Sequence, residues 1–380
     1  MDRSPSGERG PSLDDADVPA APSSPSEEAS PVEGGADSAL PDSGSPYVAA
    51  VVKSTGIHPK SARMVSLGLA TFTADGQITR TWHGVFTIGE DPGPVHLHGL
   101  EPDDLDGAPR FGTVLGTVGE FLDGRELITH DLPRTWGFIV EEAKRARRHA
   151  NRANRGRRGR GRGRVRAGRI PAPKTVTDTL VTARRQAIDV PDTRLRGVAR
   201  AYGLDAPSPV ASVDNIGVPE RERTMGDVEL LVDLWRAQRD RGEGEEGAGG
   251  TSSSIFATWP TDDLRADHVG LQRSGVRVDA MEAPRPQANP GKYRPGGKLK
   301  AGMEFAIAPE LTSPADDIIG AGVKAGLAYS EKVTRETSVL VCNRPADVTP
   351  EELVGKAMHA HRKEIPLVSD VAFLRLLDEM

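Results

Sequence analysis

The sequence predicts an α/β protein with two domains, a larger one over residues 47–239 and a smaller one over residues 301–380. Three observations indicate this fold class. Strand-like segments in the first region give way to alternating helical and strand patterns. The second region repeats the alternation of strands and helices on a smaller scale. A stretch rich in Gly, Glu and Ser begins after the first region, so we expect a linker over residues 240–300.

The first domain is expected to open with an antiparallel meander of three strands. Apolar runs cover residues 47–52, 63–72 and 78–86, and an Asp75-Gly76 turn separates the last two runs. A Gly-containing turn between two such runs is a strong local signal for a hairpin.

Helices and one further strand follow the meander. Apolar side chains recur at helical spacing over Phe111–Leu122, and Glu126–Thr129 has the pattern of a buried strand. A helix is expected over Trp136–Ala146. Shorter amphipathic helices are predicted over residues 177–186, 193–202 and 226–238. This order of elements predicts a sheet covered by helices.

The second domain is long enough for one small α/β core. Strands are predicted over residues 303–308, 327–329, 338–342 and 366–368. Helices are predicted over residues 314–325, 350–362 and 370–377.

Charge is strongly separated along the chain, although the formal net charge is only -6. Residues 1–46 carry ten acidic and two basic side chains and almost no large apolar ones. Such a segment cannot bury enough apolar surface to offset the entropy lost on ordering, so we expect a disordered acidic tail.

Residues 144–169 form an arginine tract with twelve arginines, one lysine and no acid. Glycine interleaved with arginine suits contact with a phosphate backbone without reading of base sequence. The alternative is a solvated insertion that pairs with the acidic tail, in self-association or autoinhibition. The candidate nucleic-acid contacts are Arg145, Arg147, Arg148, Arg155, Arg157, Arg158, Arg160, Arg162 and Arg164.

Other features exclude some classes of protein. No run approaches the roughly 18 to 20 apolar residues of a membrane span, and the N-terminus is acidic, unlike a signal peptide. Cys342 is the only cysteine, which excludes an intramolecular disulfide and a thiolate zinc cluster. We therefore expect a cytoplasmic protein, either free or associated with the nucleoid.

Four segments of the first domain carry a resemblance to a known enzyme family. Over roughly residues 46–240 the chain resembles the DEDDh 3′–5′ exonucleases, which include the proofreading epsilon subunit of bacterial DNA polymerase III. The resemblance implies a ribonuclease H-like fold and hydrolysis of phosphodiester bonds by two divalent ions. The segments are Val51-Val52-Lys53-Ser54-Thr55-Gly56, His96-Leu97-His98-Gly99-Leu100, His130-Asp131-Leu132-Pro133-Arg134-Thr135 and Glu222-Arg223-Thr224-Met225-Gly226-Asp227.

The resemblance places the four metal-binding carboxylates of the family at Val51, Lys53, Thr135 and Asp227, and the general-base histidine at Glu222. Only Asp227 matches the family. Hard divalent cations need several anionic oxygens, so we expect neither efficient two-metal nuclease activity nor a metal cofactor.

Two hypotheses follow for this degenerate site. In the first, the Lys53 ammonium occupies the vacated cation position and pairs with Asp227, stabilising the fold without metal. In the second, Asp227, Asp131 and Glu222 form a rearranged site for Mg²⁺ or Mn²⁺. The three motif histidines, His96, His98 and His130, are expected to be loop or core hydrogen-bonding residues.

Residues 301–380 resemble a BRCT domain, a module found in DNA ligases, replication factors and repair proteins. The resemblance is carried by residues 302–307, 325–327, 333–342 and 365–374. It places the family's phosphate pocket at Ala308, Pro309 and Lys356. Alanine has no hydroxyl and proline no amide hydrogen, so only Lys356 is a phosphate candidate. We expect protein docking or DNA association rather than phosphopeptide recognition.

The resemblances together imply a noncatalytic pseudo-exonuclease that binds nucleic acid as an accessory protein in DNA replication or repair. The arginine tract would bind DNA, and the BRCT-like domain would recruit a protein partner. The alternative is a 3′–5′ DNA exonuclease, similar to the polymerase III epsilon subunit, with an altered metal site. RNA is an open alternative to DNA, since Gly-Arg tracts bind both polymers.

Overall fold

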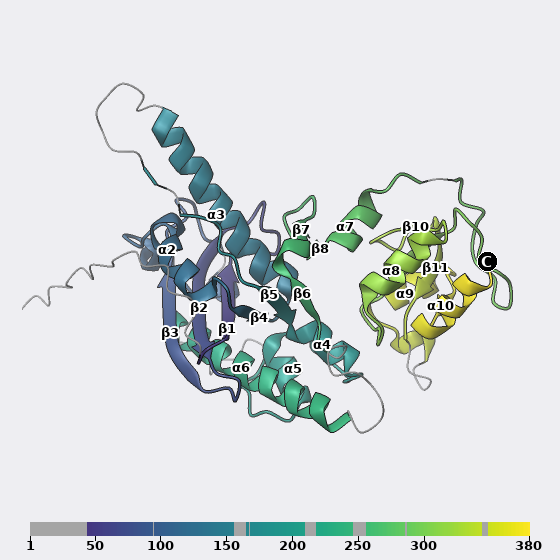
Figure 1. Ribbon diagram of the computed structural model, residues 1–380, viewed down its shortest axis with the longest axis horizontal. Helices are drawn as coiled ribbons and strands as arrows, with labels where there is room; N and C mark the ends of the chain where they lie inside the picture. The colour runs from purple at the N-terminus through teal and green to yellow at the C-terminus, as the bar shows by residue number, and fades with distance from the viewer. Residues whose placement is uncertain are drawn as a thin grey trace, which may run out of the picture. The chain divides into compact units, whose positions relative to one another are not determined.

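The computed structural model describes residues 44–93, 95–155, 165–166, 168–209, 218–245, 256–285, 287–343 and 349–380 (Figure 1). The predicted acidic tail lies outside the described residues except for its last three positions. Of these, Ser45 is buried, and its carbonyl oxygen accepts a hydrogen bond from Arg125. The described fold therefore begins slightly before the predicted boundary. Residues 156–164 of the arginine tract also lie outside the described residues.

The first sheet has six strands in the order β3-β2-β1-β4-β5-β6. β1, β2 and β3 form the predicted antiparallel meander. β4 and β5 run parallel to β1, and β6 pairs antiparallel with β5 at the edge. The strands are β1 (Tyr47–Ser54), β2 (Met64–Phe72), β3 (Ile78–Val85), β4 (Glu126–Thr129), β5 (Thr175–Asp178) and β6 (Thr258–Pro260).

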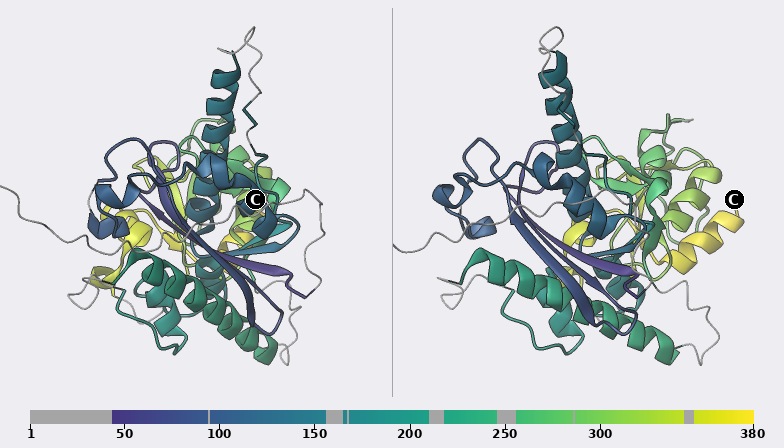
Figure 2. Two further views of the ribbon diagram at one scale, coloured as in Figure 1. Left: turned by 90° about the vertical axis from the view of Figure 1, so that its left-hand side faces the viewer. Right: turned by 60° about the vertical axis from the view of Figure 1, so that its left-hand side comes forward.

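Helices cover both faces of this sheet (Figures 1 and 2). On one face, Val48 and Ala50 of β1 pack in a core with α2 (Phe111–Leu122) and α3 (Leu132–Arg155). On the other face, Ala49 and Ala70 pack against α6 (Glu220–Glu245). Successive side chains of a strand point to opposite faces, so β1 contributes to both cores. The short helices α4 (Thr179–Arg185) and α5 (Leu195–Ala201) pack beside α6.

Gly68 of β2 allows α6 to lie directly on the sheet. A methyl group at this position would approach the Cγ2 atoms of Thr224 and Val228 to 2.9 Å. We expect Gly68→Ala to lower the free energy of unfolding by about 1 to 3 kcal/mol through overpacking. Gly116→Ala is the control, because Gly116 is exposed inside α2 with open space around it, and there alanine should stabilise by about 0.5 to 1 kcal/mol. Urea unfolding measures both changes, and two changes of the same sign would contradict this account.

The structure extends several predicted elements of the first domain. Helix α3 runs from Leu132 to Arg155, beyond the predicted Trp136–Ala146. The residues after Ala146 are mainly arginine and alanine, which favour a helix, so the helix continues past its apolar part. Helix α6 likewise exceeds its predicted range. The helix predicted over 177–186 is confirmed as α4, which runs from Thr179 to Arg185, whereas the first two predicted residues belong to β5, which ends at Asp178. The Asp178 carboxylate caps α4 by accepting hydrogen bonds from the amides of Leu180 and Val181.

The prediction of a linker over residues 240–300 is wrong for much of its length. β6 joins the first sheet, where its three residues, Thr-Trp-Pro, are stabilised by pairing with the edge of β5. Trp259 of β6 packs against the first core. A two-stranded sheet and a helix follow, namely β7 (Leu264–Ala266), β8 (Gln272–Ser274) and α7 (Gly275–Glu282).

The second sheet has four parallel strands in the order β10-β9-β11-β12. Its alternating side chains form one core with α8 and α10 and another with α9. Each element lies close to its predicted position, although the helix predicted over 350–362 is divided by Leu353 and Val354. The elements are β9 (Glu304–Ile307), α8 (Ala315–Lys324), β10 (Ala328–Tyr329), β11 (Thr337–Val341), the 3₁₀ helix Pro350–Glu352, α9 (Gly355–Arg362), β12 (Leu367–Val368) and α10 (Asp370–Asp378).

No helix within the described ranges is long and apolar enough to cross a membrane.

Candidate functional site

Three of the candidate site residues, Val51, Lys53 and Asp227, lie where β1 meets α6. Strand alternation places Ala49, Val51 and Lys53 on the same face of β1. Val51 packs against the apolar core that includes Val228 of α6, so its surroundings are aliphatic.

Asp227 on α6 is held by two cations rather than one. The Lys53 Nζ atom lies 2.7 Å from its Oδ2 atom, and the Arg196 Nε atom lies 2.7 Å from its Oδ1 atom. The side chains of Asp227, Lys53 and Arg196 are 10%, 23% and 18% exposed. The predicted ion pair between Lys53 and Asp227 is therefore confirmed, whereas no sequence pattern indicated Arg196. With both carboxylate oxygens engaged, the three side chains carry a net charge of about +1.

Thr135 and His130 lie at the carboxyl end of β4 and are used in local structure. The Thr135 hydroxyl donates to the carbonyl oxygen of His130 at 3.1 Å. The His130 ring bonds to the Thr179 hydroxyl through Nδ1 and to the Thr193 carbonyl oxygen through Nε2, each at 2.9 Å. Burial lowers the pKa of His130, so its neutral form donates one ring hydrogen to the Thr193 carbonyl. The expected hydrogen-bonding role of His130 is confirmed.

His98 also has the hydrogen-bonding role expected for it. It is buried, its Nδ1 atom accepts from the Leu100 amide at 3.2 Å, and its Nε2 atom bonds to the Pro92 carbonyl oxygen at 3.0 Å. The side chain of His96 lies outside the described residues.

The residues suggested as substitute metal ligands are not brought together. Glu222 is exposed on α6, and Asp131 pairs with Arg134 at 3.0 Å at the start of α3. Among the residues that the structure describes, no group of three or more acidic, histidine or cysteine side chains is placed to hold a metal ion. With Lys53 and Arg196 on the remaining acid, this site does not suit the divalent ions of the exonuclease family.

A second buried acid, Glu220, lies two helical turns before Asp227 and was not identified from the sequence. Its carboxylate accepts hydrogen bonds from Ser66 and Thr224, and one oxygen lies 2.8 Å from the His83 ring. Burial raises the pKa of Glu220, but these hydrogen bonds outweigh it and lower the pKa below its ordinary value. Ser66 lies opposite Lys53 in the pairing of β1 with β2. The polar group around Glu220 is therefore next to the ion pair of Lys53 and Asp227 beneath α6.

The arginine candidates have two different roles in the structure. Arg145 is a structural residue, because its guanidinium bonds to Glu142 and to the carbonyl oxygens of Pro59 and Lys60. Four other arginines are exposed along the second half of α3, which extends beyond the neighbouring elements (Figure 2). They are the candidates Arg147, Arg148 and Arg155, together with Arg152, which was not among the candidates. The candidates Arg157, Arg158, Arg160, Arg162 and Arg164 lie outside the described residues.

Lys356, the phosphate candidate of the second domain, has partners inside the protein. Its Nζ atom donates to the Ile307 carbonyl oxygen at 2.9 Å and lies 3.3 Å from Glu331. Burial lowers the pKa of Lys356, and Glu331 opposes that shift. Much of its charge is therefore balanced internally.

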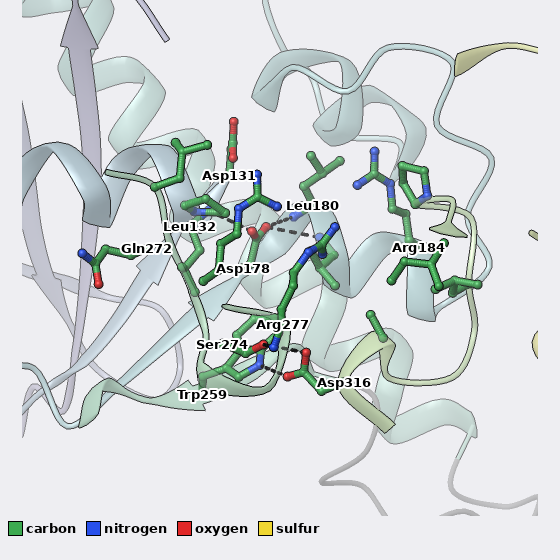
Figure 3. Close-up of a pocket in the computed structure, with 18 of the residues that line it drawn as sticks. Asp131, Leu132, Asp178, Leu180, Arg184, Trp259, Gln272, Ser274, Arg277 and Asp316 are labelled. Carbon is green, nitrogen blue, oxygen red and sulfur yellow. Dashed lines mark hydrogen bonds between the residues drawn. The ribbon is translucent and has the colours of Figure 1, made fainter. Parts of the chain in front are cut away.

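A cavity of about 380 Å³ lies beside the carboxyl ends of β4 and β5 (Figure 3). Its lining comes from the first domain, from residues 259–277 and from the second domain, including Ala308, Pro309 and Lys356. The carboxyl edge of parallel strands is a common ligand-binding position in α/β proteins. Sequence reasoning missed the cavity because its walls come from segments far apart in the chain. Val51, Lys53, Thr135 and Asp227 are not among its lining residues.

Comparison with known proteins gives only distant structural likeness. No family model matches the chain. No curated protein matches it either. Among solved structures, exonuclease I has a TM-score of 0.37 at 11% identity, over 51% of this chain and 41% of that chain. Exonuclease I from E. coli with a dT13 oligonucleotide has a TM-score of 0.38 at 11% identity, over 53% of this chain and 42% of that chain. The chain thus matches less than half the length of these proteins.

Proposed function

We propose that this protein is a noncatalytic nucleic-acid-binding accessory factor in DNA replication or repair, built on a ribonuclease H-like exonuclease fold. The observation that carries the proposal is the pairing of Lys53 and Arg196 with Asp227. Two fixed cations lie on the one matching acid, where the family would hold divalent ions. This arrangement repels metal ions but remains attractive to a phosphodiester.

The strand arrangement supports the fold part of the proposal. A meander of three antiparallel strands is extended by two strands parallel to β1, in the order β3-β2-β1-β4-β5. A mixed sheet of this kind, covered by helices on both faces, supports the ribonuclease H-like fold that the resemblance implies. It places β1 at the centre and the ends of β1 and β4 near α6, as the resemblance requires.

The exposed arginines of α3 support polymer binding. Each is a cation on a solvated helix, and each phosphate contact releases a condensed counterion, which makes affinity dependent on salt. DNA is the proposed polymer, and RNA is the alternative that direct competition at fixed salt would identify.

Replacing Arg147, Arg148, Arg152 and Arg155 together by glutamine is expected to weaken binding of single-stranded DNA. If all four contact phosphates, the slope of log affinity against log salt should fall by roughly 3, since each contact contributes about 0.7 on single strands. Fluorescence anisotropy of a labelled dT30 strand over an about fourfold range of salt, from roughly 50 to 200 mM, measures the slope. Arg145→Gln is the wrong control, because Arg145 supports the fold. Arg362→Gln on α9 is exposed and distant in sequence, and an equal loss there would contradict a specific role for α3.

A nuclease assay tests the noncatalytic part of the proposal. The purified protein is incubated with 3′-labelled single-stranded DNA and Mg²⁺ or Mn²⁺, and nucleotide release is measured beside Asp227→Asn. No release above the variant is expected, even at large protein excess. Release by the wild type that Asp227→Asn abolishes would overturn the proposal and favour an exonuclease with an altered metal site.

For residues 301–380 we propose a BRCT-like module that recruits a protein partner. Four parallel strands in the order β10-β9-β11-β12, with α8 and α10 on one face and α9 on the other, support this assignment. The internal pairing of Lys356 with Glu331 argues against its use as a phosphopeptide anchor. We expect partner capture by the full chain to be lost when residues 301–380 are removed, with DNA affinity retained.

A further inference from the structure

The cavity beside β4 and β5 contains more basic than acidic side chains. Six arginine and lysine residues line it beside four acids. The basic residues are Arg134, Arg184, Arg185, Arg273, Arg277 and Lys356, and the acidic residues are Asp131, Asp178, Asp316 and Glu331.

Each of the four acids has partners of its own. Asp131 pairs with Arg134, and Asp178 accepts from the amides of Leu132, Leu180 and Val181. Asp316 accepts from Trp259 Nε1 at 2.9 Å and Ser274 Oγ at 2.7 Å (Figure 3). Glu331 accepts two hydrogen bonds from Arg277 and also contacts Arg273, Lys356 and the Tyr329 hydroxyl.

Arg184 and Arg185 of α4 are not balanced in this way. Arg184 is half-buried, and its guanidinium has no hydrogen bond or ion pair with any described residue. Arg185 donates to the Phe256 carbonyl oxygen at 2.7 Å and lies over the Trp259 ring, but its buried Nε atom has no partner among the described residues. A buried donor without an acceptor costs about 1 to 3 kcal/mol, so native proteins rarely retain one without use.

We propose that this cavity binds a small phosphate monoester, of nucleoside monophosphate size, whose phosphoryl oxygens are held by Arg184 and Arg185. A guanidinium presents a planar fork of donors that matches phosphate oxygens, and Arg185 adds a second positive charge to the same wall of the cavity. Burial lowers the pKa of Arg184, and the more distant charges of Asp178, Glu310 and Asp131 only partly oppose that shift. This ligand is distinct from the polymer proposed for α3.

The remaining walls suit the organic part of such a ligand. Leu180, Ile307, Pro309 and Leu311 supply an apolar surface. A volume of about 380 Å³ lies within the range of small-molecule pockets, whose size is roughly 300 to 1,000 Å³. A phosphate with one compact organic group therefore suits the site better than a bare ion.

Calorimetric titration of the full chain with thymidine 5′-monophosphate tests the proposal. Binding is expected, whereas thymidine without the phosphate should not bind. Arg184→Ala should weaken binding by at least about tenfold, because a charge-assisted contact is lost. Its melting temperature should change little, since the Arg184 guanidinium has no hydrogen bond or ion pair with a described residue. Arg362→Ala is the control and should bind as the wild type does.

The same phosphate occurs at the 5′ end of a DNA strand. A 5′-phosphorylated dT10 strand is therefore compared with its 5′-hydroxyl form. Preference for the phosphorylated strand without binding of the free nucleotide would support the site and identify a strand end as its ligand. Absence of any phosphate-dependent binding by the wild type, or equal binding by Arg184→Ala, would overturn the proposal.

Discussion

Replacing Asp227 by alanine is expected to lower the free energy of unfolding by about 3 kcal/mol, because it leaves two mostly buried cations without a counter-ion. Lys53 and Arg196 would then face each other across the space that the carboxylate occupied. The loss should be visible as a lower urea midpoint. Unlike removal of a metal ligand, it should be the same with and without Mg²⁺.

The matched control is Asp233→Ala on the same helix. Asp233 lies 3.6 Å from Arg236 and its side chain is 54% exposed, so its removal should cost less than about 0.5 kcal/mol. Equal losses for the two variants would show that the pairing at Asp227 contributes little. Stabilisation of the wild type by Mg²⁺ that Asp227→Ala abolishes would instead indicate a metal site.

Glu331→Gln is expected to lower the free energy of unfolding by about 2 to 3 kcal/mol at neutral pH, less than for a fully buried pair because Glu331 is 28% exposed. The carboxylate connects α7 and α9 through Arg277 and Lys356. Glutamine would leave both cations without their acid. Thermal unfolding of the full chain provides the comparison, and Glu352→Gln, at an exposed cap, is the control.

The same residue gives a pH dependence of defined sign. Burial alone would raise the pKa of Glu331, but Arg277, followed by Lys356 and Arg273, lowers it well below the ordinary value. A lowered pKa contributes stability above the unfolded value, near 4.5, that is lost as pH falls toward the folded value. Wild-type stability should thus decline below about pH 5, and Glu331→Gln should flatten part of that decline. An identical slope for the variant would contradict the assignment.

Local pattern predicted the elements whose signal lies within a single segment. The meander, α2 and β4 have apolar periodicity strong enough to define them, and α2 has its predicted bounds. β5 was missed because four residues run directly into α4 without a turn. β6 was missed because a three-residue strand containing Pro260 is stabilised by its neighbour in the sheet rather than by its own composition.

The candidate site was predictable only where family motifs covered it. Lys53 and Asp227 stand at motif positions, so their ion pair could be predicted. Arg196 lies on α5, outside every motif, and reaches Asp227 only because α5 packs against α6. Arg184 resembles any arginine in the last turn of a helix, and its lack of a partner is a tertiary property that no sequence pattern records.

The pairing of β6 with β5 determines where the first domain can be separated from the rest of the chain. A fragment ending at Arg239, where the sequence suggested a boundary, would lack β6 and uncover the backbone of β5. It would also lose Ala257, which is fully buried. An uncovered strand edge invites pairing with a second molecule. The three residues of β6 lie beyond the Gly-rich stretch where a cut would normally be placed. A soluble first domain therefore has to include them.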